Sequence, residues 1–155
     1  MKVVVVSDSH GNIANLKYVM GFAEKIFAGA VIHCGDWNTL EAIEVVASYN
    51  IAIFTVLGNA DIDPSVSAKC KELSAKFDQR FLKFQLNGRK IGVIHSIDNW
   101  KLKIENLDIV FTGHFHSQKE WVKKRVKIVR PGSLEEGVAF AVYDTDTNKV
   151  EFIHD

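Results

Sequence analysis

The sequence predicts an α/β fold, and three observations support this class. Short apolar runs at Val3–Val6, Ala30–Ile32 and Ile51–Leu57 have the length of buried strands. The segments between these runs carry apolar residues at helical spacing. Strands that alternate with helices pair in parallel through right-handed crossovers. We therefore expect the first half of the chain to form a parallel βαβαβ unit.

The elements of this first half can be placed from local signals. Asn12 is expected to cap the first helix because its side chain can accept from free backbone amides, and Gly29 ends that helix. The second helix is expected to begin near Asn38, with Glu41 completing a pair that resembles a capping box. Asp63-Pro64 opens a third helix because proline fits the first helical position. The predicted strands are Lys2–Ser7, Ala30–Cys34 and Ile51–Leu57.

The second half is expected to form hairpins. Phe81–Leu86 and Lys90–His95 flank Asn87-Gly88, which is the sequence of a type I′ turn. A short helix is predicted within Asn99–Leu107. The other predicted strands are Asp108–Thr112, Glu120–Val122, Val126–Val129, Val138–Tyr143 and Val150–Ile153. We expect one domain, residues 1–155, with a parallel half and an antiparallel half.

Charge and composition argue against some classes of partner. Lys+Arg and Asp+Glu are equal at 19 each, which does not favour broad attraction to nucleic acid or membranes. No apolar run approaches the roughly 18 residues of a membrane helix, and the N-terminal valines are too few for a signal peptide. Cys34 and Cys70 are expected to be reduced thiols of a cytoplasmic protein. A homo-oligomer is left open.

Residues that can bind metals follow five of the apolar runs. Carboxyl ends of strands in open α/β sheets are where such folds bind ligands, so these residues are expected to converge on one polar metal centre. Asp36 is the natural bridge between two divalent ions because one carboxylate has two oxygens. Two ions about 3.5–4 Å apart can clamp the attacking and leaving oxygens of an in-line displacement. The candidate ligands are Asp8, His10, Asp36, Asn59, His95, His114 and His116.

Net charge indicates the kind of substrate that this centre would attract. Two divalent ions, the carboxylates of Asp8 and Asp36 and a bridging hydroxide would leave a small positive charge. A phosphodiester carries one negative charge, so the match is good. We therefore expect a small-molecule phosphodiester as the substrate.

Together, these blocks resemble the calcineurin-like metallophosphoesterase superfamily, and within it the small prokaryotic phosphodiesterases. The blocks are Asp8-x-His10-Gly11, Gly35-Asp36, Gly58-Asn59-x-Asp61, His95, Gly113-His114-x-His116 and, late in the chain, Arg130-Pro131-Gly132-Ser133. The resemblance implies a four-layer αββα sandwich of two mixed β-sheets flanked by helices. It implies two divalent ions, for which we expect manganese, with nickel, iron or zinc as alternatives. The implied ligands are Asp8, His10, Asp36 and His116 for one ion and Asp36, Asn59, His95 and His114 for the other.

The resemblance also implies hydrolysis of a small or nucleotide-like phosphodiester by attack of metal-bound hydroxide. His95 and Asn59 are expected to act in catalysis as well as in metal binding. Ala60 stands where many relatives have a histidine proposed as a proton donor, which disfavours monoesters and poor leaving groups. Ser96 replaces a glycine and is expected to narrow access, whereas Phe115 is expected to pack away from the ions.

Two other functions are left open. One is a phosphomonoesterase or nucleotidase, against which Ala60 argues. The other is a non-catalytic protein-binding scaffold, like the small eukaryotic protein-sorting subunit that shares the fold. That subunit has lost part of the ligand set, whereas all seven ligand positions are competent in this chain. The complete set therefore favours an enzyme.

Several other polar residues are expected to have ordinary structural roles. His33 and Cys34 are expected to pack inside a strand, and His154 is expected to be solvated. Asp61 is expected either to orient a neighbouring ligand or to cap a turn, and both alternatives are left open. Placement of Trp37 in the pocket or in the core is also left open. The basic run from Lys123 to Arg130 is expected to be a solvated turn and not a nucleic-acid surface.

Overall fold

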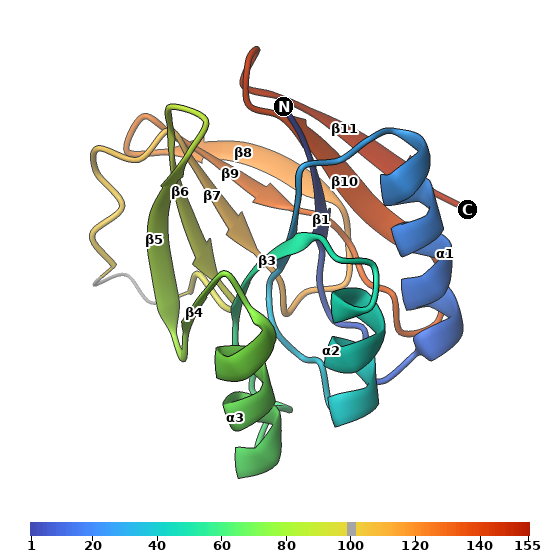
Figure 1. Cartoon of the computed structure of the whole chain (residues 1–155). Helices are drawn as coiled ribbons and strands as arrows, with labels where there is room; N and C mark the ends of the chain where they lie inside the picture. The colour runs from blue at the N-terminus through green and yellow to red at the C-terminus, as the bar shows by residue number, and fades with distance from the viewer. Residues whose placement is uncertain (99–101) are drawn as a thin grey trace.

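The computed structural model describes residues 1–98 and 102–155, which form two mixed β-sheets and three helices (Figure 1). One sheet has six strands in the order β11-β10-β1-β2-β3-β4, and the other has five in the order β5-β6-β7-β9-β8. The helices are α1 (Ile13–Lys25), α2 (Leu40–Ala47) and α3 (Pro64–Leu73). The strands of the six-stranded sheet are β1 (Lys2–Val6), β2 (Ala30–His33), β3 (Ala52–Val56), β4 (Lys76–Asp78), β10 (Ala139–Asp144) and β11 (Lys149–His154). Those of the five-stranded sheet are β5 (Phe81–Leu86), β6 (Arg89–Ile94), β7 (Ile109–Thr112), β8 (Lys119–Lys123) and β9 (Val126–Arg130).

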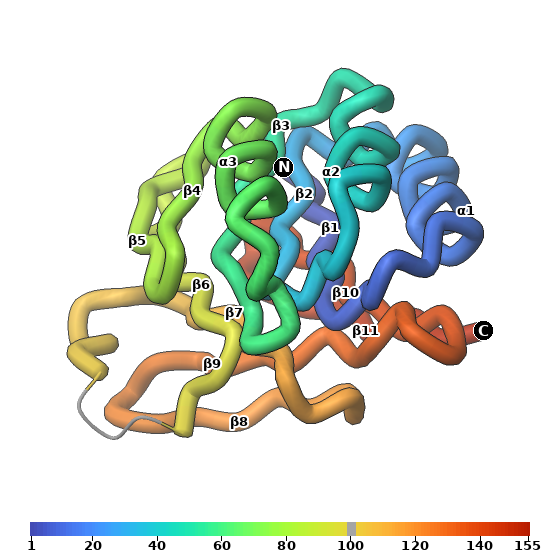
Figure 2. Tube along the Cα trace, turned by 90° about the horizontal axis from the view of Figure 1, so that it is seen from below, coloured from blue at the N-terminus to red at the C-terminus, as the bar shows by residue number. Residues whose placement is uncertain are grey.

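Strand β1 shows how the layers are held together. Side chains of a strand alternate between its two faces. Val4 and Val6 pack with the helices, whereas Val3 and Val5 pack against the five-stranded sheet. Because both faces are covered, β1 is apolar throughout and not alternating. The three helices lie together on one side of the molecule, and β8 and β9 lie on the other side (Figure 2).

The outer face of the five-stranded sheet has a smaller apolar cluster. Ile128 and Val110 of this face pack with Ile104, and Trp121 lies against the same cluster. Part of the short helix predicted over Asn99–Leu107 falls on residues 99–101, which lie outside the described residues. Residues 102–107 contain a turn and no helix. Within the described part of the chain, the helices therefore pack on the six-stranded sheet.

The predicted α/β class with two mixed sheets flanked by helices is confirmed. Asn12 caps α1 as predicted, because its side chain accepts a hydrogen bond from a backbone amide of the first turn. Helix α3 begins at Pro64 as predicted, and the side chain of Asp63 caps it. The type I′ turn is also confirmed, since Asn87 and Gly88 have φ of 48° and 82° between antiparallel strands. None of the described helices combines the length and the apolar character that a membrane crossing requires.

Four details of the prediction are wrong. Helix α1 ends at Lys25 and not at Gly29, because Phe27 already takes the positive φ, 53°, that turns the chain out of the helix. The second helix is capped by Thr39, not Asn38, because the backbone amide of Asn38 is bound by Asp61 instead. The second half is not an antiparallel unit, since β6, β7 and β9 pair in parallel and β10 joins β1. Strand β4 was not predicted, because its sequence Lys-Phe-Asp has no apolar run and it forms where α3 returns the chain beside β3.

Candidate metal centre

All seven predicted ligands come together at the carboxyl ends of five strands. Asp8 and His10 follow β1, Asp36 follows β2 and Asn59 follows β3, all from the six-stranded sheet. His95 follows β6, and His114 and His116 follow β7 of the five-stranded sheet. The two sheets thus present their carboxyl ends at the same edge of the sandwich. We call these seven residues the cluster.

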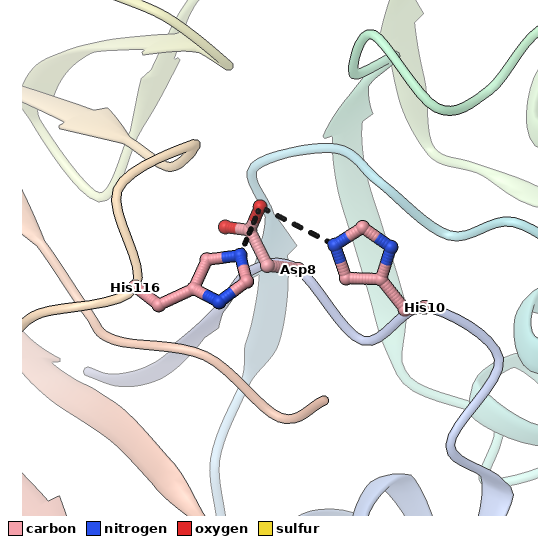
Figure 3. A group of neighbouring side chains, drawn as sticks. All are labelled: Asp8, His10 and His116. Carbon is pink, nitrogen blue, oxygen red and sulfur yellow. Dashed lines mark ion pairs between the residues drawn. The ribbon is translucent and has the colours of Figure 1, made fainter. Parts of the chain in front are cut away.

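Asp8 is the meeting point of one half of the cluster. Its Oδ1 atom lies 3.9 Å from Nε2 of His10 and 3.6 Å from Nε2 of His116. Both rings are directed at this one carboxylate oxygen, although they come from loops far apart in the sequence (Figure 3). The other oxygen, Oδ2, accepts hydrogen bonds from the Ser7 hydroxyl at 2.6 Å and the His114 amide at 3.1 Å. The side chain is therefore held with one oxygen facing the imidazoles.

Asp36 lies between the two halves. Its Oδ2 atom is 3.4 Å from Nε2 of His10 and 3.3 Å from Nε2 of His95. Its Oδ1 atom accepts a hydrogen bond of 2.8 Å from the backbone amide of Ala60. This amide contact does not depend on the side chain at position 60. One carboxylate oxygen of Asp36 thus faces imidazoles from both sheets.

The second half is built around His95 and Asn59. His95 is 6% exposed, and its Nδ1 lies 2.8 Å from the carbonyl of Cys34. That carbonyl can only accept, so Nδ1 carries the proton and Nε2 is directed into the cluster. The Asn59 Oδ1 atom lies 2.9 Å from this Nε2 and 3.1 Å from Nδ1 of His114. The hydrogen bond to Cys34 thus sets the orientation of the ring, as is usual for metal-binding histidines.

The donor set fits divalent metal ions. Two side-chain atoms that are buried and have no hydrogen-bond partner among the described residues, Oδ1 of Asp8 and Nε2 of His10, face each other in the cluster. Ligand atoms of Asp8, His10 and His116 lie within 4.8 Å of one another, and so do those of Asp8, Asp36 and His95. Carboxylate oxygens and imidazole nitrogens without thiolate suit manganese, iron, nickel or zinc. Unpaired buried atoms are costly, and a cation would satisfy them.

The pKa values of the cluster reflect burial and close charges. Burial raises the pKa of Asp36, but the His95 ring, the Ala60 amide and the His10 ring outweigh it and hold the pKa at about 2. Burial lowers the pKa of His95, but Asp36 and Asp8 outweigh it, and the net shift is upward. For Asp8, burial dominates and raises the pKa despite the Ser7 hydroxyl. The site therefore keeps a carboxylate at Asp36 and attracts positive charge.

The backbone of the cluster is held in an unfavourable conformation. Asp8, His10, Asp36 and His114 all have positive φ, between 43° and 72°, where residues with a side chain are uncommon. A side chain at Gly58 would meet Oδ1 of Asp36 at 2.1 Å, so only glycine allows this close approach. Such strain collects at functional sites, where the surrounding structure holds it in place.

A second set of buried polar residues supports the loops of the cluster. Asp61 accepts from the amides of Asp36 and Gly58 with one oxygen and from Asn38 with the other. The first alternative for Asp61 therefore applies, because it binds the amides of Asp36 and Gly58 and thereby orients Asp36. Its hydrogen-bond partners among the described residues all precede it in the chain, so they do not include the turn that follows it. We call Ser9, His33, Trp37, Thr55 and Asp61 the support network.

His33 has the structural role that was predicted for it. Its Nδ1 accepts from the Gly35 amide at 3.1 Å, so its Nε2 carries the proton and donates to the Ser9 hydroxyl at 3.0 Å. Its ring stacks on Trp37 at 3.6 Å. Trp37 is fully buried, and its Nε1 donates to the Thr55 hydroxyl at 2.9 Å, which places it in the core and not in the pocket.

Glu135 was missed by the sequence reasoning. Its Oε2 atom lies 3.8 Å from Nε2 of His10 and 3.6 Å from Nδ1 of His116. Its backbone is tied to the cluster region, since Asn12 donates to its carbonyl at 2.8 Å and the Ser133 hydroxyl accepts from its amide at 3.1 Å. The only local signal was its place two residues after the Pro-Gly-Ser segment, since no apolar strand precedes it.

Family comparison agrees with this geometry. A profile of the calcineurin-like phosphoesterase superfamily domain matches residues 1–148. The chain belongs to this superfamily. Phosphoester hydrolysis is the reaction class after which the family is named.

This chain is similar to phosphodiesterases and also to a protein-sorting subunit. A phosphodiesterase from Methanocaldococcus jannaschii is 25% identical over 141 residues, which cover 85% of this chain and 83% of that protein. The solved structure of an archaeal phosphodiesterase has a TM-score of 0.87 at 22% identity and covers 100% of both chains. Vacuolar Protein Sorting 29 from Cryptosporidium parvum has a TM-score of 0.64 at 17% identity, covering 99% of this chain and 96% of that one. At these identities, the two structures support the fold alone.

Proposed function

We propose that this chain is a metal-dependent phosphodiesterase that acts on a small or nucleotide-like phosphodiester. The observation that carries the proposal is the pair of unpaired buried atoms, Oδ1 of Asp8 and Nε2 of His10, at the centre of a complete donor set. Such a pair is costly in a folded protein unless something else binds there. Family membership supports phosphoester hydrolysis as the reaction.

Two divalent ions, for which we propose manganese, would be held by the two halves of the cluster. We assign one ion to Asp8, His10, Asp36 and His116 and the other to Asp36, Asn59, His95 and His114. When bound, such ions supply an acidic water molecule and positive charge that stabilises phosphoryl oxygens. The residues supply the geometry: the Cys34 carbonyl keeps His95 Nε2 directed inward, and the Ala60 amide keeps Asp36 in place.

A cavity beside the second half of the cluster is the proposed place for the diester. It has a volume of about 420 Å³ and is lined by Asn59, His95 and His114 on the cluster side. Leu57 and Ile94 supply an apolar wall, and the cavity is also lined by Gln79, Arg80 and Ser96. This size and mixture suit a small organic ester.

The side chain at position 60 bears on the choice between diesters and monoesters. Ala60 has no group that could donate a proton, so a leaving group must depart without help from this position. A phenolate departs readily, whereas the alkoxide of a simple alkyl ester does not. We therefore propose that esters of phenols are hydrolysed faster than simple alkyl esters. Between esters with the same leaving group, the single negative charge of a diester matches the small positive charge expected of the metal-loaded cluster, which favours the diester over the monoester.

The test is hydrolysis of bis(p-nitrophenyl) phosphate and p-nitrophenyl phosphate. Protein stripped with a chelator is assayed alone and after addition of manganese, nickel, zinc or magnesium. We expect no turnover by the stripped protein, turnover after metal addition, and a preference for the diester. A clear preference for the monoester would instead indicate a phosphomonoesterase or nucleotidase, and turnover without metal would contradict the metal requirement.

A binding scaffold is the second candidate, favoured by the likeness in fold to Vacuolar Protein Sorting 29. The presence of residues able to bind metal at all seven predicted ligand positions argues for the enzyme instead. Elemental analysis distinguishes the two candidates. Near-zero metal in the purified protein, together with no activity on either ester after metal addition, would support the scaffold.

A further inference from the structure

The structure divides the basic run of the β8–β9 hairpin into two groups. Lys124 pairs with Glu105 at 3.1 Å, and Lys127 pairs with Glu120 at 3.4 Å and donates to the carbonyl of Asn148. Other cations of the hairpin line a cavity of about 340 Å³ instead. These are Lys119, Lys123 and Arg130. The prediction of a solvated turn therefore fits Lys124 and Lys127, but it does not fit the cations that line the cavity.

Strand geometry brings this second group together. Lys119, Trp121 and Lys123 alternate along β8 and therefore share one face of the strand. Arg130 lies opposite Lys119 in the register of β8 and β9. Trp121 packs with Ile128 on the face of the five-stranded sheet that points away from the other sheet. Three cations and an aromatic ring thus gather on this outer face.

The charged groups lie close to aromatic rings. The Arg130 guanidinium carbon is 5.2 Å from the ring centre of Phe115 and 5.7 Å from that of Trp121. Arg130 donates to the carbonyl and the hydroxyl of Ser117, which fixes its position. The Lys119 ammonium lies 5.2 Å from the centre of the Trp121 ring. Asp98 is a carboxylate that also lines the cavity, so the positive charges outnumber the negative one.

The cavity borders the cluster through one loop. Gly113 and Phe115 line the cavity, and His114 between them belongs to the cluster. The rings of His114 and Phe115 are 5.0 Å apart, and Phe115 is 50% exposed. Phe115 therefore lies next to both His114 of the cluster and Arg130 of the cavity. An aryl phosphodiester of the simplest kind has no second charged group to place there.

We propose that this basic cavity binds the base and an additional phosphate of a nucleotide diester whose scissile phosphate lies at the cluster. The inference rests on the proposed phosphodiesterase function. Lysine and arginine attract phosphate, and aromatic side chains such as the half-exposed Phe115 can stack on nucleobases. The combination of both beside a phosphodiesterase centre fits a nucleotide better than an aryl or alkyl ester.

The kinetic test uses three substrates: one without a nucleoside, one with a nucleoside, and one with a nucleoside and an additional phosphate. They are bis(p-nitrophenyl) phosphate, the p-nitrophenyl ester of thymidine 5′-phosphate, and the same nucleotide ester with a 3′-phosphate, so that all three release the same phenolate. Lys123→Gln should lower the ratio of kcat/KM for the phosphorylated nucleotide ester to kcat/KM for the aryl diester by about fivefold. Trp121→Leu, which keeps an apolar side chain but loses the flat ring, should lower it by roughly tenfold. Lys124→Gln, on the same hairpin but paired with Glu105, is the matched control and should keep the wild-type ratio.

A binding test separates this cavity from the cluster. Affinity for a fluorescent phosphorylated dinucleotide is measured by anisotropy in the presence of a chelator, at several salt concentrations. Affinity decreases with salt, so the slope of log affinity against log salt is negative. The magnitude of this slope should decrease by about 0.7 for each phosphate contact that Lys119→Gln or Lys123→Gln removes. A wild-type slope and a wild-type kinetic ratio in the Lys119→Gln/Lys123→Gln double variant would overturn the proposal.

Failure of the proposed function would look different. The wild-type protein would then hydrolyse none of the three substrates with any metal, whereas the chelator experiment would still report on the cavity. Thermal melting of Trp121→Leu shows whether this variant keeps its fold, because Trp121 also packs on the apolar cluster. If it melts early, the two lysine variants, whose side chains are exposed, still decide the question.

Discussion

The cluster and the support network are adjacent and rich in polar groups, yet they are built differently. The support network is buried throughout, whereas Asn59, His114 and His116 of the cluster are exposed. In the support network, both ring nitrogens of His33 and both carboxylate oxygens of Asp61 have protein partners. In the cluster, Oδ1 of Asp8 and Nε2 of His10 have none among the described residues. The support network is therefore complete without a ligand, whereas the cluster is not.

This difference separates residues that hold the fold from residues that bind something else. A buried polar atom costs free energy unless it is paired, so the fold by itself does not account for Asp8 Oδ1 or His10 Nε2. The strained backbone agrees, because four residues of the cluster have positive φ. Changes in the cluster should thus affect metal binding and activity, and changes in the support network should affect stability.

The largest effect is expected for Asp36→Asn, which would remove charge from the residue shared by both halves. We expect kcat/KM for an aryl phosphodiester to fall roughly 10²-fold or more in the metal-loaded variant. Asp63→Asn is the matched control, because Asp63 caps α3 away from the cluster and asparagine caps equally well. Wild-type turnover by the Asp36→Asn variant would refute the bridging role.

Loss of a single imidazole is expected to remove one ion. His10→Ala and His95→Ala act on different halves of the cluster, and each should lower bound manganese from about two ions per chain to about one. Native mass spectrometry of the loaded proteins measures this content. His154→Ala, near the C-terminus and exposed, should keep both ions. If His10→Ala and His95→Ala bind as much metal as the wild type, the assignment of ligands is wrong.

Glu135→Gln is expected to have a smaller effect. Glu135 lies 3.6 Å from Nδ1 of His116, on the side of the ring away from Asp8, where a carboxylate would orient the imidazole. Loss of such a group costs about tenfold in metal affinity. Isothermal titration with manganese measures it, and Glu136→Gln is the neighbouring control with the same change in charge. Equal affinities for the two variants would show that Glu135 does not support His116.

The smallest effect concerns the support network and its dependence on pH. Burial lowers the pKa of His33 well below its usual value, so the ring is neutral in the folded protein. The unfolded chain takes up a proton at His33 below about pH 6.5. Unfolding is therefore favoured as the pH falls, and one such group contributes about 1 kcal/mol between pH 6.5 and 5.5.

His33→Gln should remove this contribution while the bound metal stays the same. Urea denaturation at pH 7.5 and 5.5, in the presence of a chelator, gives the free energy of unfolding for both proteins. We expect the decrease on acidification to be smaller in the variant than in the wild type. If the variant loses metal but keeps the wild-type pH dependence, His33 belongs functionally to the cluster and not to the support network.

Much of the cluster could be predicted because its signal is local. Each of the seven residues of the cluster lies shortly after the end of an apolar strand, and the residue types themselves limit the chemistry. Glu135 has no such signal, because hydrogen bonds to distant residues bring its loop to His10 and His116: Asn12 donates to the carbonyl of Glu135, and the Ser133 hydroxyl donates to that of Asp8. The same holds for β4, whose three residues form a strand only because β3 lies beside them.

Local sequence patterns account for the apolar strands, the cap at Asn12, the start of α3 at Pro64 and the set of residues able to bind metal. These features depend on neighbours within a few residues, so the local pattern contains them. The tertiary structure decided that β10 pairs with β1, that both sheets end at one edge, and that Lys119, Lys123 and Arg130 share a cavity. These features depend on contacts between distant parts of the chain. The spacing of apolar residues within one segment does not show which other segment it will contact.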